Sequence, residues 1–204
     1  MASVVRLSTR RNRRWLKPMN VSEQISTVAA DKQVQLEGLH SSLSSFLAAA
    51  DVPEETEKTS LREECWSILQ IAEHVAVVEA GGLERLLERE SNPGPPDYAL
   101  DRYVAAAALD RSKPRIAPER VHPAGRFGTL AEACAELKNR RQETIAFIES
   151  NTEDLRTKWV NHPLTDMDGH QLILFLSNHL LRHAAQIEEI KNCPAYKAAL
   201  EKAS

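Results

Sequence analysis

Apolar residues recur every three or four positions in four long stretches of the chain, and this spacing predicts four amphipathic helices. The stretches cover residues 21–50, about 60–90, 129–150 and about 168–191. No segment between them has a convincing strand pattern. The pattern therefore predicts an all-α fold, built as a four-helix bundle.

Capping residues mark several of the helix boundaries. Thr129-Leu-Ala-Glu132 reads as a capping box at the start of the third helix. The second helix has two candidate boxes, which begin at Ser60 and Ser67, and the sequence leaves the choice between them open. Pro194 is expected to end the fourth helix.

The connection between the second and third helices is unusually long, because residues 91–128 separate them. It contains several prolines and a possible short helix at 98–110. Antiparallel neighbours in a bundle need only about 2–8 linking residues. A connection of this length can carry the chain back along the bundle, which favours a parallel arrangement of the second and third helices.

Composition supports a helical protein without disulfide bonds. Aromatic residues make up 5% of the chain and there are only 7 glycines, which disfavours a β-sandwich or barrel. No apolar run reaches the roughly 18 residues that span a bilayer. An odd number of cysteines without paired spacing excludes a disulfide scaffold, so we expect a cytoplasmic protein. The cysteines are Cys65, Cys134 and Cys193.

The net charge of −3 combines two different regions. Residues 1–18 hold six basic side chains and no acidic one, so the rest of the chain carries a net charge of −9. We interpret residues 1–19 as a basic, disordered leader, with a targeting peptide as the alternative. Residues 20–195 would form the bundle and residues 196–204 a tail. The acidic bundle disfavours nucleic-acid binding.

Three histidines fall on the apolar stripes of the predicted helices. His179 and His183 are four residues apart, so they share one face of the last helix, and His74 lies on the stripe of the second. Buried imidazoles without partners are costly, and a divalent metal ion removes that cost. Three protein ligands leave coordination positions open, as in catalytic sites. The alternative is that ordinary hydrogen bonds satisfy these histidines within the core.

Residues near these histidines give weaker signals. Gln186 lies one turn after His183 and either orients that ring or is an ordinary exposed amide. Glu73 adjoins His74 but should point elsewhere, so we interpret it as a solvated charge. Glu189 falls outside the stripe. The histidines that we consider weak candidates are His122, His162 and His170, of which the last is expected at a solvent or capping position.

Two motifs resemble those of the DinB/YfiT-like superfamily. Residues 65–79, CWSILQIAEHVAVVE, are similar to its Trp-Ser helix that ends in a histidine, and residues 178–190, NHLLRHAAQIEEI, resemble its closing His-x-x-x-His-x-x-Gln-Ile helix. The segment 117–127 is similar to a loop found in one branch of the family. The resemblance covers residues 22–195, and the two histidine motifs together are fairly specific.

The resemblance implies an up-down-down-up bundle with a divalent metal ion (nickel, zinc, manganese or iron) on His74, His179 and His183. It also implies a small-molecule substrate and a homodimer. Characterised relatives include transferases and isomerases that use bacillithiol, mycothiol or glutathione, and others are described as metal-dependent hydrolases.

Three functions therefore stand as hypotheses. The first is a thiol-dependent S-transferase or isomerase, in which the metal favours the thiolate of a low-molecular-weight thiol. The second is a metal-dependent hydrolase, which is weakened because no carboxylate lies convincingly on an inner stripe to act as general base. The third is a non-enzymatic interaction module in which the metal acts as a staple.

Overall fold

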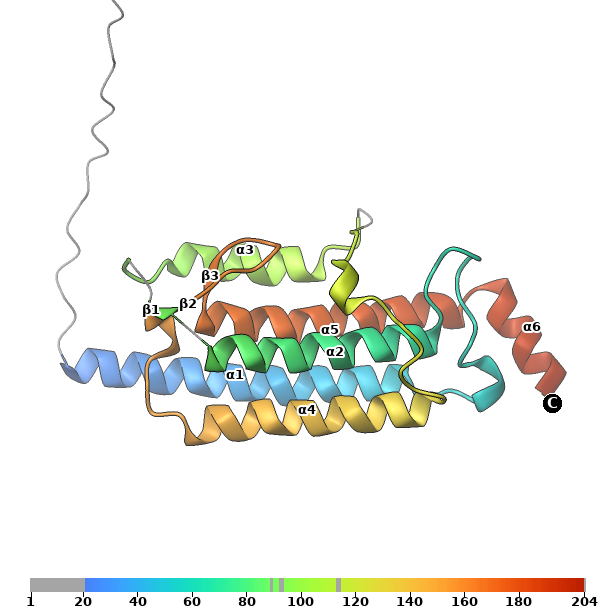
Figure 1. Ribbon diagram of the computed structural model, residues 1–204, viewed down its shortest axis with the longest axis horizontal. Coiled ribbons are helices and arrows are strands. Elements are labelled where there is room, and N and C mark those ends of the chain that lie inside the picture. Colours follow the sequence, from blue (N-terminus) through green and yellow to red (C-terminus); the bar gives the residue numbers. More distant parts are fainter. Residues whose placement is uncertain (1–20, 89, 92–93, 113–114, 204) are drawn as a thin grey trace, which may run out of the picture.

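The computed structural model describes residues 21–88, 90–91, 94–112 and 115–203, so the expected leader lies outside the described residues. A further helix lies alongside the bundle and another follows it (Figure 1). The bundle helices are α1 (Val21–Ala49), α2 (Ile68–Leu87), α4 (Leu130–Ser150) and α5 (Gly169–Lys191), and the additional helices are α3 (Tyr98–Leu109) and α6 (Pro194–Ala203).

The bundle has the up-down-down-up order that the resemblance implies, and its second and third long helices are parallel, as the long connection favours. In Figure 1, α1 and α5 run in one direction while α2 and α4 run in the other. The parallel helices α2 and α4 pack against each other, and α1 packs against α5. Between α2 and α4 the chain returns through α3, which packs along α5. None of the described helices is long and apolar enough to cross a membrane.

Short extended and 3-10 segments, absent from the predicted elements, join the helices. The strands β1 (Glu90–Ser91), β2 (Lys158–Val160) and β3 (Met167–Asp168) form a small antiparallel sheet in the order β1-β2-β3. The 3-10 turns are η1 (Glu54–Thr56), η2 (Glu119–Val121) and η3 (Leu155–Thr157).

Local capping explains where the bundle helices begin. Ser67 and Gln70 form a reciprocal capping box, so α2 starts at the later of its two candidate positions. The expected box at Thr129 caps α4, and Asp168 caps α5 with a box of its own. Helix α5 ends at Lys191, before Pro194 as predicted, and Pro194 then opens α6 at a position where a missing N–H costs nothing.

The helix stripes bury two apolar clusters, one toward each end of the bundle. Where α2 and α5 meet, Gly82 allows their close approach, since a Cβ at this position would lie 2.8 Å from the side chain of Leu176. Gly82 therefore serves packing at this contact, although glycine lowers the intrinsic stability of a helix. The largest completely buried apolar side chains include Leu39, Phe46, Ile68, Ile71, Leu137 and Leu172.

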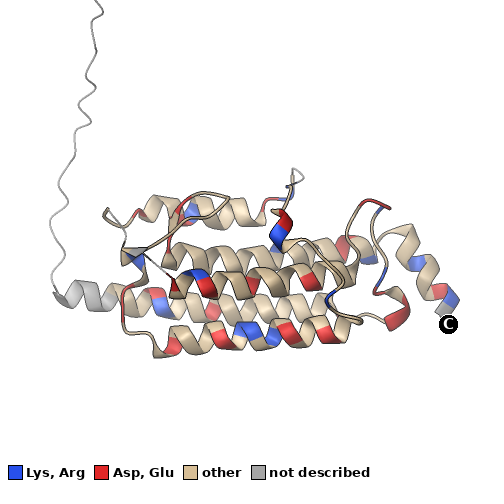
Figure 2. Ribbon diagram, in the orientation of Figure 1, with Lys and Arg blue, Asp and Glu red and all other residues tan. Residues whose placement is uncertain are grey.

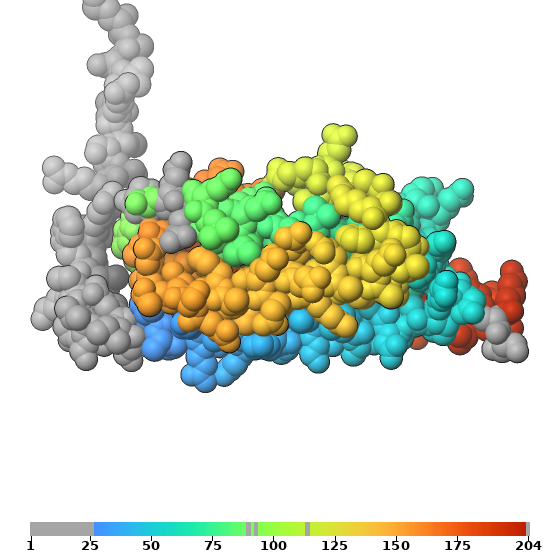
Figure 3. Space-filling view, turned by 60° about the horizontal axis from the view of Figure 1, so that its bottom comes forward, coloured from blue at the N-terminus to red at the C-terminus, as the bar shows by residue number. Residues whose placement is uncertain are grey.

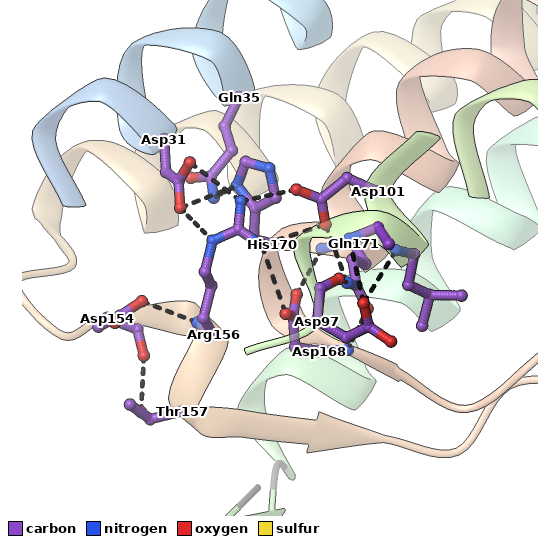
Figure 4. A network of polar contacts seen from close by, with 12 residues as sticks. Asp31, Gln35, Asp97, Asp101, Asp154, Arg156, Thr157, Asp168, His170 and Gln171 are labelled. Carbon is purple, nitrogen blue, oxygen red and sulfur yellow. Dashed lines mark hydrogen bonds and ion pairs between the residues drawn. The ribbon is translucent and has the colours of Figure 1, made fainter. Parts of the chain in front are cut away.

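A buried arginine joins several elements near the start of α5 (Figure 4). Arg156, in η3, is 3% exposed and forms ion pairs with Asp31 of α1 and Asp101 of α3 at 2.5 and 2.9 Å. A third carboxylate, that of Asp168, lies 3.6 Å away. The cation of one short turn thus holds α1, α3 and the start of α5 together.

His170 belongs to this buried region, which corrects the expectation of a solvent or capping position. Its ring is buried, and the side-chain amide of Gln35 donates a hydrogen bond to His170 Nδ1 at 2.9 Å. Burial lowers the pKa of His170, with the nearby Arg156 acting in the same direction. The first turn of α5 faces the core because α1 and α3 cover it.

Candidate metal centre

The structure brings together the three histidines that the stripes single out. His179 and His183 lie one turn apart on α5, and His74 faces them from α2. His179 Nε2 lies 3.4 Å from His74 Nε2 and 3.1 Å from His183 Nε2. One ring nitrogen from each residue falls within 4.8 Å of the others, a spacing that allows all three to bind one metal ion.

Hydrogen bonds at the far side of two rings fix which nitrogen faces the centre. His74 Nδ1 donates to the backbone carbonyl of Val121 at 2.7 Å, and His183 Nδ1 donates to the side-chain oxygen of Gln186 at 2.9 Å. A neutral imidazole with its hydrogen on Nδ1 has a lone pair on Nε2. Gln186 is therefore the residue that orients His183, one of the two roles left open by the sequence.

The lone pairs explain why a cation fits this donor set. His74 and His183 both direct an Nε2 lone pair toward His179, which carries at most one hydrogen on its own Nε2. That single hydrogen cannot make a well-directed bond to both neighbours, and a further proton would introduce a buried positive charge. A metal ion accepts all three lone pairs at once.

Burial keeps these rings neutral, the form that binds a metal. Burial lowers the pKa of His74 to about 4, although its bond to the Val121 carbonyl acts in the opposite direction. The pKa values of His179 and His183 lie well below the usual range because the surrounding protein removes water from around these rings and other histidines lie nearby. Of the three side chains, His179 keeps partial exposure.

Other rings pack around the triad and shield its sides. Trp66 lies over His74 with ring centroids 4.7 Å apart, and Phe175 stacks on His179 at 5.1 Å. His162 also packs against Phe175, with ring centroids 4.3 Å apart, so Phe175 contacts both His162 and His179. By sequence, His162 is only a weak candidate, and Trp66 stands out only through the Trp-Ser motif of the resemblance.

The segment that follows η2 is fastened to α2 beside the triad. Glu73 is 1% exposed and accepts hydrogen bonds from the backbone N–H groups of Ala124 and Gly125 and from the side chain of Arg126. The interpretation of Glu73 as a solvated charge is therefore wrong. Its bonds to the loop lower its pKa even though burial opposes this, so the carboxylate anchors the segment that supplies the Val121 carbonyl.

A cavity of about 1080 Å³ opens onto the triad. Its walls come from α2, α3, α5, η2 and the loop at residues 162–164. Figure 3 shows the yellow-green segment after α3 as an arch over the bundle, with a hollow below it. Glu189 lies at this cavity and pairs with Arg111, outside the histidine stripe as its position predicts.

Comparison with known proteins places this architecture in a family. Residues 35–187 match the family model of the DinB superfamily. The uncharacterised protein YuaE of Bacillus subtilis is 29% identical over 127 residues, which cover 62% of this chain and 77% of YuaE. The structure also resembles that of YfiT from Bacillus subtilis, with a TM-score of 0.52 and 12% identity over 87% of this chain and 91% of YfiT. YfiT is described as "a probable metal-dependent hydrolase with an unusual four-helix bundle topology".

Proposed function

The chain belongs to the DinB superfamily, and from this membership and the geometry of its histidines we propose that it is a metal-dependent enzyme. His74, His179 and His183 would hold a divalent cation through their Nε2 atoms. The observation that carries the proposal is the convergence of these atoms at a cavity large enough for small-molecule substrates. Imidazole ligands suit zinc, nickel and iron, and manganese is the further candidate.

The residues of the chain would prepare this centre in two ways. When bound, a divalent cation acts as a Lewis acid that favours the deprotonated form of a thiol or water beside it. The Val121 carbonyl and Gln186 hold two ligand rings in the required tautomer. Trp66 and Phe175 cover the sides of His74 and His179, which restricts water to the cavity side.

We propose more specifically that the enzyme is a thiol-dependent transferase or isomerase. In a transfer, the sulfur of a low-molecular-weight thiol attacks an electrophilic carbon, so an S–C bond forms while the leaving group departs with its bonding electrons. The thiol proton passes to solvent. A free thiol has a pKa of about 8.5 and needs only a modest decrease to ionise at neutral pH. The reaction therefore requires no general base from the protein.

Hydrolysis is the second candidate, and the description of YfiT favours it. Water has a much higher pKa than a thiol, so a hydrolase site usually also provides a general base. The carboxylates that line the described cavity are Glu64, Glu84, Glu88 and Glu189, and none of them belongs to the cluster of potential metal ligands. The thiol reaction needs no such base, and for that reason we place it before hydrolysis.

Metal analysis and paired activity assays test the proposal. Purified protein should contain close to one equivalent of a transition metal, whereas His179→Ala should lose it and His40→Ala, which changes an exposed histidine, should keep it. Metal-loaded protein should conjugate glutathione or a related thiol to 1-chloro-2,4-dinitrobenzene. Less than about a tenth of an equivalent after reconstitution would contradict the metal site.

The same assays separate the alternatives. Cleavage of p-nitrophenyl acetate that needs metal but no thiol would favour the hydrolase. Metal that raises stability without turnover in either assay would favour a metal-stapled interaction module. The proposed homodimer is checked by light scattering coupled to gel filtration.

A further inference from the structure

In the part of the chain that the structure describes, the cavity is lined by arginines and not by lysines. Among the described residues, six arginines line it and no lysine does, although the bundle region as a whole is acidic. Figure 2 shows basic positions at η2 and on the adjoining part of the bundle. Arginine is the side chain best suited to bind carboxylate or phosphate oxygens through two parallel hydrogen bonds.

Two of these arginines already have partners within the chain. Arg111 pairs with Glu189, and the side chain of Arg182 donates to the backbone carbonyl of Asp110. Both lie where α3 and α5 meet the cavity. Their contacts show how arginines at this site are held when the chain itself provides an acceptor.

Arg85 and Arg120 differ from this first pair. Arg85 is half-buried on α2 and Arg120 is exposed on η2, and neither has an ion-pair or side-chain hydrogen-bond partner within the part of the chain that the structure describes. The two guanidinium groups lie near enough that Arg120, together with burial, lowers the pKa of Arg85. Glu84 and Glu88 line the same cavity. Their charges attract Arg85 and oppose the decrease in its pKa, although, among the described residues, neither forms an ion pair with it within 4.0 Å.

His162 connects these arginines with the triad. The backbone N–H of Leu164 donates to His162 Nδ1 at 3.2 Å, so the neutral ring has its hydrogen on Nε2. Burial lowers the pKa of His162 to about 4, and the nearby Arg85 and Arg120 act in the same direction. The ring therefore offers a neutral N–H donor at the cavity, near both arginines and in contact with Phe175, which stacks on His179.

We propose that Arg85 and Arg120 bind an oxyanionic group of the substrate, a carboxylate or a phosphate, while its reacting end lies at the histidine triad. The apolar rings of the cavity, such as Trp66 and Phe175, suit the carbon skeleton between the two ends. The inference rests on the proposed function only for the role of the triad. The oxyanion site itself depends on the arginines and is tested without turnover.

Calorimetric titration of the full chain with three probes provides the test. The probes are 4-phenylbutyrate, phenyl phosphate and the neutral 4-phenylbutyramide, and each is titrated into metal-free and metal-loaded protein. We expect at least one charged probe to bind about tenfold or more tightly than the amide in both forms, and more weakly as salt is added. The charged probe that binds more tightly identifies carboxylate or phosphate as the preferred group.

Arginine variants assign the binding to these residues. Arg85→Gln and Arg120→Gln should each weaken the charged probe by about tenfold and leave the amide unchanged. Arg102→Gln, the same change at an exposed position of α3 outside the cavity, should bind like the wild type. Arg120→Gln lies on an exposed turn and is informative even if Arg85→Gln folds poorly, and Arg85→Lys should recover part of the affinity.

The outcomes separate this inference from the proposed function. Equal affinity for the amide and the charged probes would overturn it, and so would charged-probe affinities in Arg85→Gln and Arg120→Gln that match Arg102→Gln. Binding that needs the metal and ignores both arginines would also overturn it, because the anion would then bind the metal directly. If His179→Ala keeps the arginine-dependent binding while wild-type protein takes up no metal, only the metal-dependent function fails.

Discussion

Helix α5 carries residues of two buried polar clusters. Both place polar groups in the protein interior, but their charges are balanced in opposite ways. Near its start, Asp168, His170 and Gln171 surround Arg156 (Figure 4). Two to four turns later, His179 and His183 meet His74. In the first cluster the cation is part of the chain and carboxylates from several helices neutralise it. In the second, three neutral nitrogens converge and the described chain provides no cation between them.

This difference indicates that the Arg156 cluster contributes to folding stability, whereas the histidine triad requires an external cation. The Arg156 cluster is complete when the chain folds, so its contribution belongs to the free energy of folding. The triad is complete only with an external cation, so part of its free energy depends on the concentration of that ion. Breaking each cluster separately should reveal this contrast.

The largest effect is expected at Arg156. Arg156→Met leaves the carboxylates of Asp31 and Asp101 without their main partner, and removal of one member of a buried ion pair costs about 3–5 kcal/mol. Urea unfolding measures this loss. Arg140→Met, which removes the surface ion pairs with Glu136 and Glu143 on α4, should cost less than about 1 kcal/mol. Equal stability of the two variants would contradict the assigned role of Arg156.

The pH dependence of stability tests the same cluster more finely. Burial raises the pKa of Asp168 from 3.8 to about 7. The negative charges of Asp101 and Asp31 also raise this pKa, whereas the Gln171 N–H and Arg156 lower it. A carboxyl with a higher pKa in the folded protein binds its proton more tightly there. The contribution of protonated Asp168 to the free energy of unfolding is therefore fully present below about pH 4 and is lost as the pH rises toward 7.

Asp168→Asn removes this titration and keeps a residue that can cap α5. The stability of wild type relative to this variant should fall, on the order of 3 kcal/mol, between pH 4 and pH 7. Unfolding free energies at several pH values provide the measurement. Asp51→Asn, at an exposed position, serves as the control. A wild-type advantage that stays constant over this range would show that Asp168 does not titrate there.

Removal of the metal is the corresponding test at the triad. With free metal at 100 times its dissociation constant, binding stabilises the folded state by about 2.7 kcal/mol. A chelator should therefore lower the melting temperature of wild type and leave that of His179→Ala unchanged. Arg156→Met should melt lower in both conditions yet keep the metal-dependent shift. Loss of that shift in Arg156→Met would mean that the two clusters are not independent.

The smallest effect is expected from the hydrogen bond behind His183. Gln186→Ala removes the acceptor for His183 Nδ1, and loss of such a partner typically weakens metal affinity by about 10–100-fold. Competition with a chromophoric chelator measures the change. Gln142→Ala alters an exposed glutamine on α4 and should leave the affinity unchanged. An unchanged affinity in Gln186→Ala would show that this bond does not support the ligand.

The sequence predicted the parts of this molecule that depend on local spacing. The apolar stripes and the capping residues at Thr129 and Ser67 define helices through contacts within a few positions. His179 and His183 could be assigned to one face because four residues make about one helical turn. The stripe also places His74 in the bundle interior, so helical spacing alone is enough to select the three histidines that the structure brings together.

Residues whose environment depends on distant segments could not be predicted in this way. Arg156 is 125 residues from Asp31, and no local pattern indicates that the two meet. Arg141 is completely buried on α4, where it binds Glu79 of α2, although a charged side chain is normally expected to face solvent. His162 reaches the cavity only because the loop before α5 folds over Phe175.

Two adjacent residues of α2, Glu73 and His74, bind the same loop. The position of this loop and the tautomer of the candidate ligand His74 therefore depend on each other. Glu73 binds the loop at Ala124 and Gly125, while His74 donates to it at Val121. If the loop swings away from α2, His74 loses the acceptor that keeps its hydrogen on Nδ1. The bonds that position this loop and the bond that sets the tautomer of His74 are therefore coupled, and a substitution at Glu73 that loosens the loop would also release the His74 ring.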